Sequence, residues 1–115
     1  MLIGELSRRT EVSPRLLRYY GEQGLLPSTR NSNGYRVYGE DALVRVCQIR
    51  RLLAAGLTTE VIAGALGCVD GPEARLDPCP QLVSLLHGEL AAMDERIDAM
   101  RRQRGSLARY LSGQA

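Results

Sequence analysis

The sequence predicts a mainly helical protein with a small β-hairpin near its N-terminus and one long helix at its C-terminus. Two short helical patterns, joined by a tight turn, occupy the first 24 residues. The pair Asn33-Gly34 follows, and it favours a hairpin because both residues tolerate positive φ. A heptad pattern of apolar residues then continues to residue 111. Together these observations predict a winged helix-turn-helix head followed by a long coiled-coil helix.

Length and composition suit one compact domain with an appendage, since the chain has 115 residues. The core must be aliphatic, because the chain has five Tyr but no Phe and no Trp. No apolar run approaches the ~20 residues that span a bilayer, and no signal-peptide pattern opens the chain. We therefore expect a soluble cytoplasmic protein without a membrane partner.

The first two helices are predicted over residues 3–10 and 14–23. Residues 11–14 read as a turn, in which Ser13 is a good N-cap and Pro14 a favoured first helical residue. Gly24 is expected to end the second helix. Two short helices joined in this way form a helix-turn-helix unit.

A β-wing is predicted over residues 28–38, with the turn at Asn33-Gly34 and a return strand at residues 35–38. A helix over residues 40–55 should follow, because apolar residues recur there at helical spacing, and Gly56 should end it. Thr58 should cap a short helix that reaches Leu66. The predicted domains are a head at 1–67, a Gly- and Pro-containing linker at 68–79, a dimerisation helix at 80–112 and a tail at 113–115.

The C-terminal helix carries a narrow apolar seam whose residues alternate steps of four and three, with Arg104 in the one missing place. Such a helix would be roughly 45 Å long, and this small chain offers nothing else for its seam to pack against. A second copy of the chain is the simplest partner. The expected dimerisation residues are Leu86, Leu90, Met93, Ile97, Met100, Leu107 and Leu111.

The charge is unevenly distributed along the chain. Residues 1–56 hold nine Arg against five acids, and residues 57–115 hold six Arg against eight acids. All fifteen basic residues are Arg, whose planar fork of donors suits phosphate groups and guanine edges. This pattern indicates nucleic-acid contact at the N-terminal end.

Four of the five Tyr lie between residues 15 and 38, where they alternate with Arg. Tyr hydroxyls and Arg side chains donate to phosphate oxygens, and the second helix of a helix-turn-helix enters the major groove. The alternative is that about half of these Tyr fill the core between helix and wing. The candidate DNA-binding residues are Ser13, Arg15, Arg18, Tyr19, Tyr20, Arg30, Asn33, Gly34, Tyr35, Arg36 and Tyr38.

Three motifs resemble the signature of MerR-family regulators. They are Leu16-Leu17-Arg18-Tyr19-Tyr20, Gly24-Leu25-Leu26-Pro27 and Asn33-Gly34-Tyr35-Arg36-Val37-Tyr38. The resemblance covers essentially the whole chain, with departures at Gly21, where an acidic residue is usual, and Gly39, where the family often has Ser. Gly21 should weaken its helix by ~1 kcal/mol relative to Ala.

The resemblance implies an antiparallel coiled-coil dimer that binds a near-palindromic promoter operator. It also implies that an effector lets the bound dimer distort the DNA, so that RNA polymerase can engage both promoter elements. The resemblance further implies that DNA is contacted by residues of the recognition helix and of the wing. These are Ser13, Arg15, Arg18 and Tyr19 for the helix, and Arg36 and Tyr38 for the wing.

The cysteines leave the effector open. Cys47 falls in the apolar stripe of the 40–55 helix and is expected to be a small buried side chain. Cys79 matches a ligand position of metal-sensing relatives, but no Cys follows it in this chain. No cofactor is therefore predicted. As an alternative, Cys68 and Cys79 could sense thiol-reactive agents, or bind a metal together with His87.

Other classes of function fit less well. An enzyme is not expected, because the chain has one His and no Gly-rich phosphate loop, nucleophile elbow or metal-ligand cluster. A protein-interaction module that uses the coiled coil alone would not explain the Arg and Tyr cluster. An architectural protein that bends DNA without an effector stays an alternative.

Overall fold

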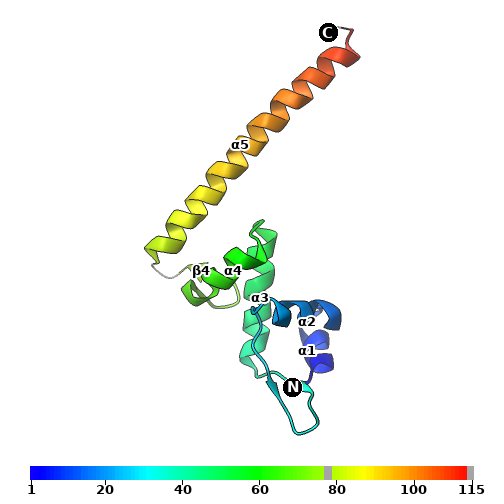
Figure 1. Ribbon diagram of the computed structural model, residues 1–115, viewed down its shortest axis with the longest axis vertical. Coiled ribbons are helices and arrows are strands. Elements are labelled where there is room, and N and C mark those ends of the chain that lie inside the picture. Colours follow the sequence, from blue (N-terminus) through cyan, green and yellow to red (C-terminus); the bar gives the residue numbers. More distant parts are fainter. Residues whose placement is uncertain (77–78, 114–115) are drawn as a thin grey trace. The chain divides into compact units, whose positions relative to one another are not determined.

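The computed structural model describes residues 1–76 and 79–113, which divide into two compact units at Pro80 (Figure 1). The first unit holds four α-helices, a 3-10 helix and two hairpins, and the second is a single helix. The prediction of a mainly helical winged helix-turn-helix head with a long C-terminal helix is confirmed. No helix within the described ranges is both long and apolar enough to cross a membrane.

The helix-turn-helix consists of α1 (Ile3–Thr10) and α2 (Pro14–Glu22). Between them Glu11 adopts a left-handed conformation with φ of 59°, and the Ser7 hydroxyl donates to the Val12 carbonyl at 2.6 Å. The Ser13 hydroxyl accepts the Leu16 amide at 3.2 Å, so the predicted N-cap is confirmed. These local bonds fix the angle at which α2 leaves the turn.

The wing is a hairpin of β1 (Thr29–Arg30) and β2 (Arg36–Val37), shorter than the sequence suggested. The Asn31 side chain accepts the amides of Asn33 and Tyr35 at 3.0 Å, and Gly34 has φ of 81°. Gly34 therefore shapes the turn as predicted, whereas Asn33 does not take a positive φ and the Asn31 side chain orders the turn instead.

The N-terminus anchors the base of the wing. The Met1 ammonium group donates to the Tyr38 carbonyl at 2.6 Å, and the Tyr38 amide donates back to the Met1 carbonyl at 2.8 Å. Leu2 forms a β-bridge with Val37. The wing is thus tied to the start of α1.

Two further helices complete the head: α3 (Asp41–Ala54) and α4 (Thr59–Ala65), which Thr58 caps as predicted. α1 packs against α2 and α3, and α4 packs against α3. The largest fully buried side chains are mostly aliphatic, as the composition requires. They are Leu6, Leu17, Tyr20, Leu25, Val46, Ile49 and Ile62.

Part of the segment expected to be a linker forms a short hairpin. A 3-10 helix (Leu66–Cys68) leads into a hairpin of β3 (Val69–Asp70) and β4 (Arg75–Leu76). The buried Gln48 side chain of α3 donates to the Gly71 carbonyl at 3.2 Å and ties this hairpin to the helix. Asp77 and Pro78 of the expected linker, and residues 114–115 of the expected tail, lie outside the described residues.

The second unit contains α5 (Pro80–Leu111), close to the expected range of 80–112; the apolar seam begins at Leu86 and ends with the helix at Leu111. Five seam residues are exposed in the single chain, with exposed fractions from 48 to 90%. These are Leu90, Ile97, Met100, Leu107 and Leu111, whereas Leu86 and Met93 are half-buried.

Candidate nucleic-acid interface

The outward face of α2 is built by helical periodicity. Leu17 and Tyr20 point into the core, which leaves Arg15, Arg18 and Tyr19 exposed on the opposite side. Gly24, with φ of 74°, ends the helix and redirects the chain toward the wing. The helix therefore presents two cations and one phenol to solvent, together with Leu16 and Glu22.

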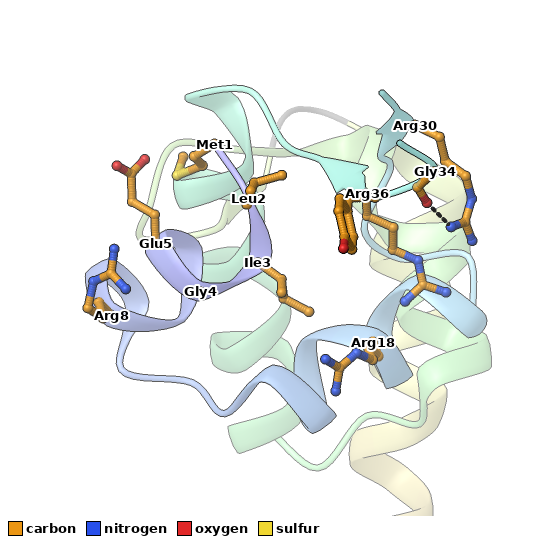
Figure 2. A pocket seen from close by; sticks show the side chains of 11 residues that line it. Met1, Leu2, Ile3, Gly4, Glu5, Arg8, Arg18, Arg30, Gly34 and Arg36 are labelled. Carbon is orange, nitrogen blue, oxygen red and sulfur yellow. Dashed lines mark hydrogen bonds between the residues drawn. The ribbon is translucent and has the colours of Figure 1, made fainter. Parts of the chain in front are cut away.

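A concave surface of about 650 Å³ lies between α1, α2 and the wing (Figure 2). Arg18 of α2 and Arg36 of β2 lie on one side of it, and Arg8 of α1 lies on another. Arg30 also lines this surface and donates to the Gly34 carbonyl at 2.6 Å. Three consecutive parts of the chain, α1, α2 and the wing, thus bring four guanidinium groups around one hollow.

The charge of this concave surface is strongly positive. Glu5 is the only acidic residue among those that line it. Within residues 1–76 and 79–113, no carboxylate forms an ion pair with any of the four guanidinium groups. Guanidinium groups bind phosphate through paired, charge-assisted hydrogen bonds, so this surface has the chemistry of a nucleic-acid backbone site.

Arg9, next to Arg8, has a different role. Its guanidinium forms two hydrogen bonds of 3.1 Å with the Glu40 carboxylate, which links α1 to the start of α3. The bonds to Arg9 lower the pKa of the Glu40 carboxyl below its ordinary value of 4.5. Because both groups are exposed, salt should weaken this pair.

Two of the candidate DNA-binding residues are core residues, which corrects the sequence analysis. Tyr20 is 1% exposed and Tyr38 is 2% exposed. Tyr20 packs on the inner side of α2, where burial raises the pKa of its phenol. The sequence alternative, in which about half of the clustered Tyr fill the core, fits these two residues.

The remaining candidates lie on the surface, and one cation that lines the concave surface, Arg8, was not anticipated. Tyr19 and Tyr35 are exposed, and Tyr35 lines the concave surface with Arg18, Arg30 and Arg36. Arg8 was missed because an Arg-Arg pair on a short helix does not indicate which member faces a binding surface. The exposed candidates are Ser13, Arg15, Arg18, Tyr19, Arg30, Asn33, Gly34 and Tyr35, and Arg36 is half-buried.

The cysteines do not form an evident metal site. Cys47 is exposed, so its expected burial is wrong: it follows the buried Val46 by one residue and lies off the inner face of α3. Cys68 and Cys79 are half-buried, and His87 is exposed on α5. In the described part of the chain, no group of three or more His, Cys, Asp or Glu could hold a metal ion. Sensing through Cys68 and Cys79 stays a prediction.

Comparison with known proteins points to one family. Residues 1–67 match the family model described as MerR HTH family regulatory protein. Over 105 residues the chain is 34% identical to the HTH-type transcriptional activator SoxR homolog of Chromobacterium violaceum, covering 91% of this chain and 70% of that protein. Over 108 residues it is 31% identical to the HTH-type transcriptional regulator ZntR of Escherichia coli, covering 93% and 75%.

A solved structure agrees with these sequence relatives. The transcription regulator PbrR691 from Ralstonia metallidurans, in complex with lead(II), matches with a TM-score of 0.79 at 30% identity. The match covers 94% of this chain and 82% of that one, so it includes both the head and the long helix.

Proposed function

The chain belongs to the MerR family of DNA-binding transcription regulators, and on this premise we propose that it binds a near-palindromic promoter operator as a homodimer. The observation that carries the proposal is the concave surface between α1, α2 and the wing, with its four guanidinium groups. α2 would lie in the major groove, while Arg30 and Arg36 of the wing would bind the adjacent phosphates.

The seam of α5 supports dimerisation. Pairing with a second copy would remove its exposed Leu, Ile and Met side chains from water. Each side chain that is fully buried in this way stabilises the dimer by about 1.5–3 kcal/mol. Assigning Ile97 to heptad position a and Met100 to d fixes the remaining positions. Asp94 and Arg101 then occupy e positions, and Glu89 and Arg96 occupy g positions.

The charges beside the seam disfavour a parallel pair. In a parallel dimer each g residue meets the following e residue of the partner. Glu89 would then face Asp94, and Arg96 would face Arg101, so both contacts would be repulsive. Arg104, at an a position, would also meet its own copy within the seam.

An antiparallel pair reverses the sign of these contacts, because e residues then lie beside e residues. With the two-fold axis between Ile97 and Met100, Asp94 of each helix lies beside Arg101 of the other. Arg104 packs beside Met93 rather than beside another Arg. In the single chain, the Arg101 guanidinium lies 4.0 Å from the Asp98 carboxylate. This exposed contact contributes little energy, so Arg101 can give it up for a contact with Asp94 of the partner helix.

The same arrangement selects one register. Sliding the helices by one heptad in either direction would place Asp94 beside its own copy, or Arg101 beside its own copy. The register centred between Ile97 and Met100 also pairs all eight seam positions, Arg104 included. The outermost pair is Leu86 with Leu111 of the partner, and the innermost is Ile97 with Met100 of the partner. We therefore propose this antiparallel register for the dimer.

At the promoter, the dimer would alter the shape of the operator so that RNA polymerase can engage both promoter elements. The activator named among the relatives supports this part of the proposal. Such a regulator would act in the cytoplasm of a bacterial cell, where promoter DNA is accessible. An effector is expected. A solved relative binds lead(II), but the described residues of this chain include no group of three or more His, Cys, Asp or Glu that could hold a metal ion.

DNA titration tests the proposal. The full chain should enrich one operator from random duplexes and bind it at least ~10³-fold more tightly than scrambled DNA, with affinity falling steeply as salt rises. Arg18→Ala should weaken operator binding by ~1–3 kcal/mol, whereas Arg102→Ala, on the outer face of α5, should leave it unchanged. Binding without salt dependence or sequence preference would refute the proposal.

A further inference from the structure

The outer face of α2 carries an apolar residue that the proposed contacts do not use. Leu16 is 40% exposed, although its neighbour Leu17 is fully buried. Tyr19, which is also exposed, lies three residues later and therefore on the same side of the helix as Leu16. Leu16 is therefore not part of the core of the head, and its exposed side chain is free to contact a ligand.

The position of Leu16 places it where base edges are contacted. It lies in the first turn of α2, and its amide is held by the Ser13 hydroxyl at 3.2 Å. The N-terminal residues of a recognition helix contact base edges in the major groove. Arg15 and Arg18, both exposed, lie on either side of Leu16 along the chain and can bind phosphates or guanine.

The chemistry of a leucine restricts what it can recognise. It has no donor or acceptor beyond the backbone, so it can contact only an apolar feature of a base edge. In the major groove that feature is the C5-methyl group of thymine. A contact with phosphate would instead require a donor, which the Leu16 side chain lacks.

We propose that Leu16 contacts the C5-methyl group of one thymine in each half-site and so specifies thymine at that position. The inference rests on the proposed function, because it requires α2 to lie in the major groove. Burying one methyl group corresponds to about a fourfold gain in affinity. Two half-sites in a dimeric complex should therefore discriminate by about 16-fold.

The test removes the methyl group from the DNA and the side chain from the protein. Operators are first selected from random duplexes with the full chain, and each thymine is then replaced by deoxyuridine in both half-sites. At one thymine per half-site, the parent protein should bind about 16-fold more weakly after replacement. Leu16→Ala should bind the two duplexes equally, with an unchanged salt dependence because no charge is removed.

Val44→Ala is the matched control, because Val44 is 38% exposed but lies on α3. It should discriminate between thymine and deoxyuridine as the parent does. If Leu16→Ala still prefers thymine over deoxyuridine as strongly as the parent does, the inference is wrong. This includes the case in which the variant binds both duplexes more weakly than the parent by the same factor. It is also wrong if the parent is indifferent to every replacement in an enriched operator. If the parent enriches no operator, the proposed function fails, and the inference fails with it.

Discussion

Tyr19 and Tyr20 are adjacent in α2 but have opposite environments. Tyr19 is 42% exposed beside Arg15 and Arg18, whereas the ring of Tyr20 is enclosed by the core. Burial also raises the pKa of the Tyr20 phenol above its ordinary value. We therefore assign Tyr19 to the DNA surface and Tyr20 to the packing that holds α2 in place.

Removing each hydroxyl in turn tests this assignment. Tyr19→Phe should lose one hydrogen bond to phosphate in each half-site. At about 1 kcal/mol or fivefold per bond, the dimer should bind about 25-fold more weakly, on operator and scrambled DNA alike. Tyr20→Phe keeps the buried ring and should leave DNA affinity unchanged. Fluorescence titrations of both variants measure the difference. A larger loss for Tyr20→Phe than for Tyr19→Phe would show that the assignment is reversed.

Periodicity explains why the sequence could not separate these residues. Leu16 and Tyr19 have the same three-residue spacing as Leu17 and Tyr20, so either pair could form the inner face of α2. The choice depends on how α1 and α3 pack against the helix. Cys47 was misplaced for a similar reason, because the apolar residues of α3 cover more of its surface than the core covers.

The elements with strong local signals were predicted nearly in full. Ser13, Pro14 and Gly24 mark the ends of α2, and the seam, which runs from Leu86 to Leu111, marks the C-terminal end of α5. The β3–β4 hairpin was missed because its strands have two residues each, too few to show alternation. Gly and Pro in that segment indicate turns in linkers and hairpins alike.

The charges beside the seam of α5 give a prediction whose sign depends on helix orientation. In the proposed antiparallel dimer, Asp94→Arg and Arg101→Asp each replace two attractive contacts with two repulsive ones. At about 0.5–1 kcal/mol per contact, each variant should raise the dimer dissociation constant by roughly 5- to 30-fold at low salt. The double variant Asp94→Arg/Arg101→Asp should restore the parent value.

Sedimentation equilibrium over a range of concentrations measures these constants. Glu95→Arg is the matched control, because it makes the same charge change at an outward f position and should have little effect. A parallel dimer would respond in the opposite direction, since each single change would replace a repulsive contact with an attractive one. Tighter association of both single variants would therefore contradict the antiparallel register.

Taken as a whole, the molecule separates two tasks between its two units. The first unit gathers guanidinium groups from α1, α2 and the wing around one concave surface. The second is one helix with an apolar seam, five residues of which are exposed. A single head contacts only a few base pairs, so high affinity for an operator requires two heads held together by α5.

The central claim is that α5 joins two heads which bind one operator together. The most direct test is operator titration of Ile97→Asp, with its association state measured by sedimentation. The variant would place a charge at the centre of the seam, so it should sediment as a monomer. A monomer has one head, so it should bind the operator about 100-fold or more weakly than the dimer, whose two linked heads bind together. Ile97→Leu should bind as the parent does. An Ile97→Asp protein that stays dimeric, or a monomer that binds the operator as tightly as the parent, would contradict the claim.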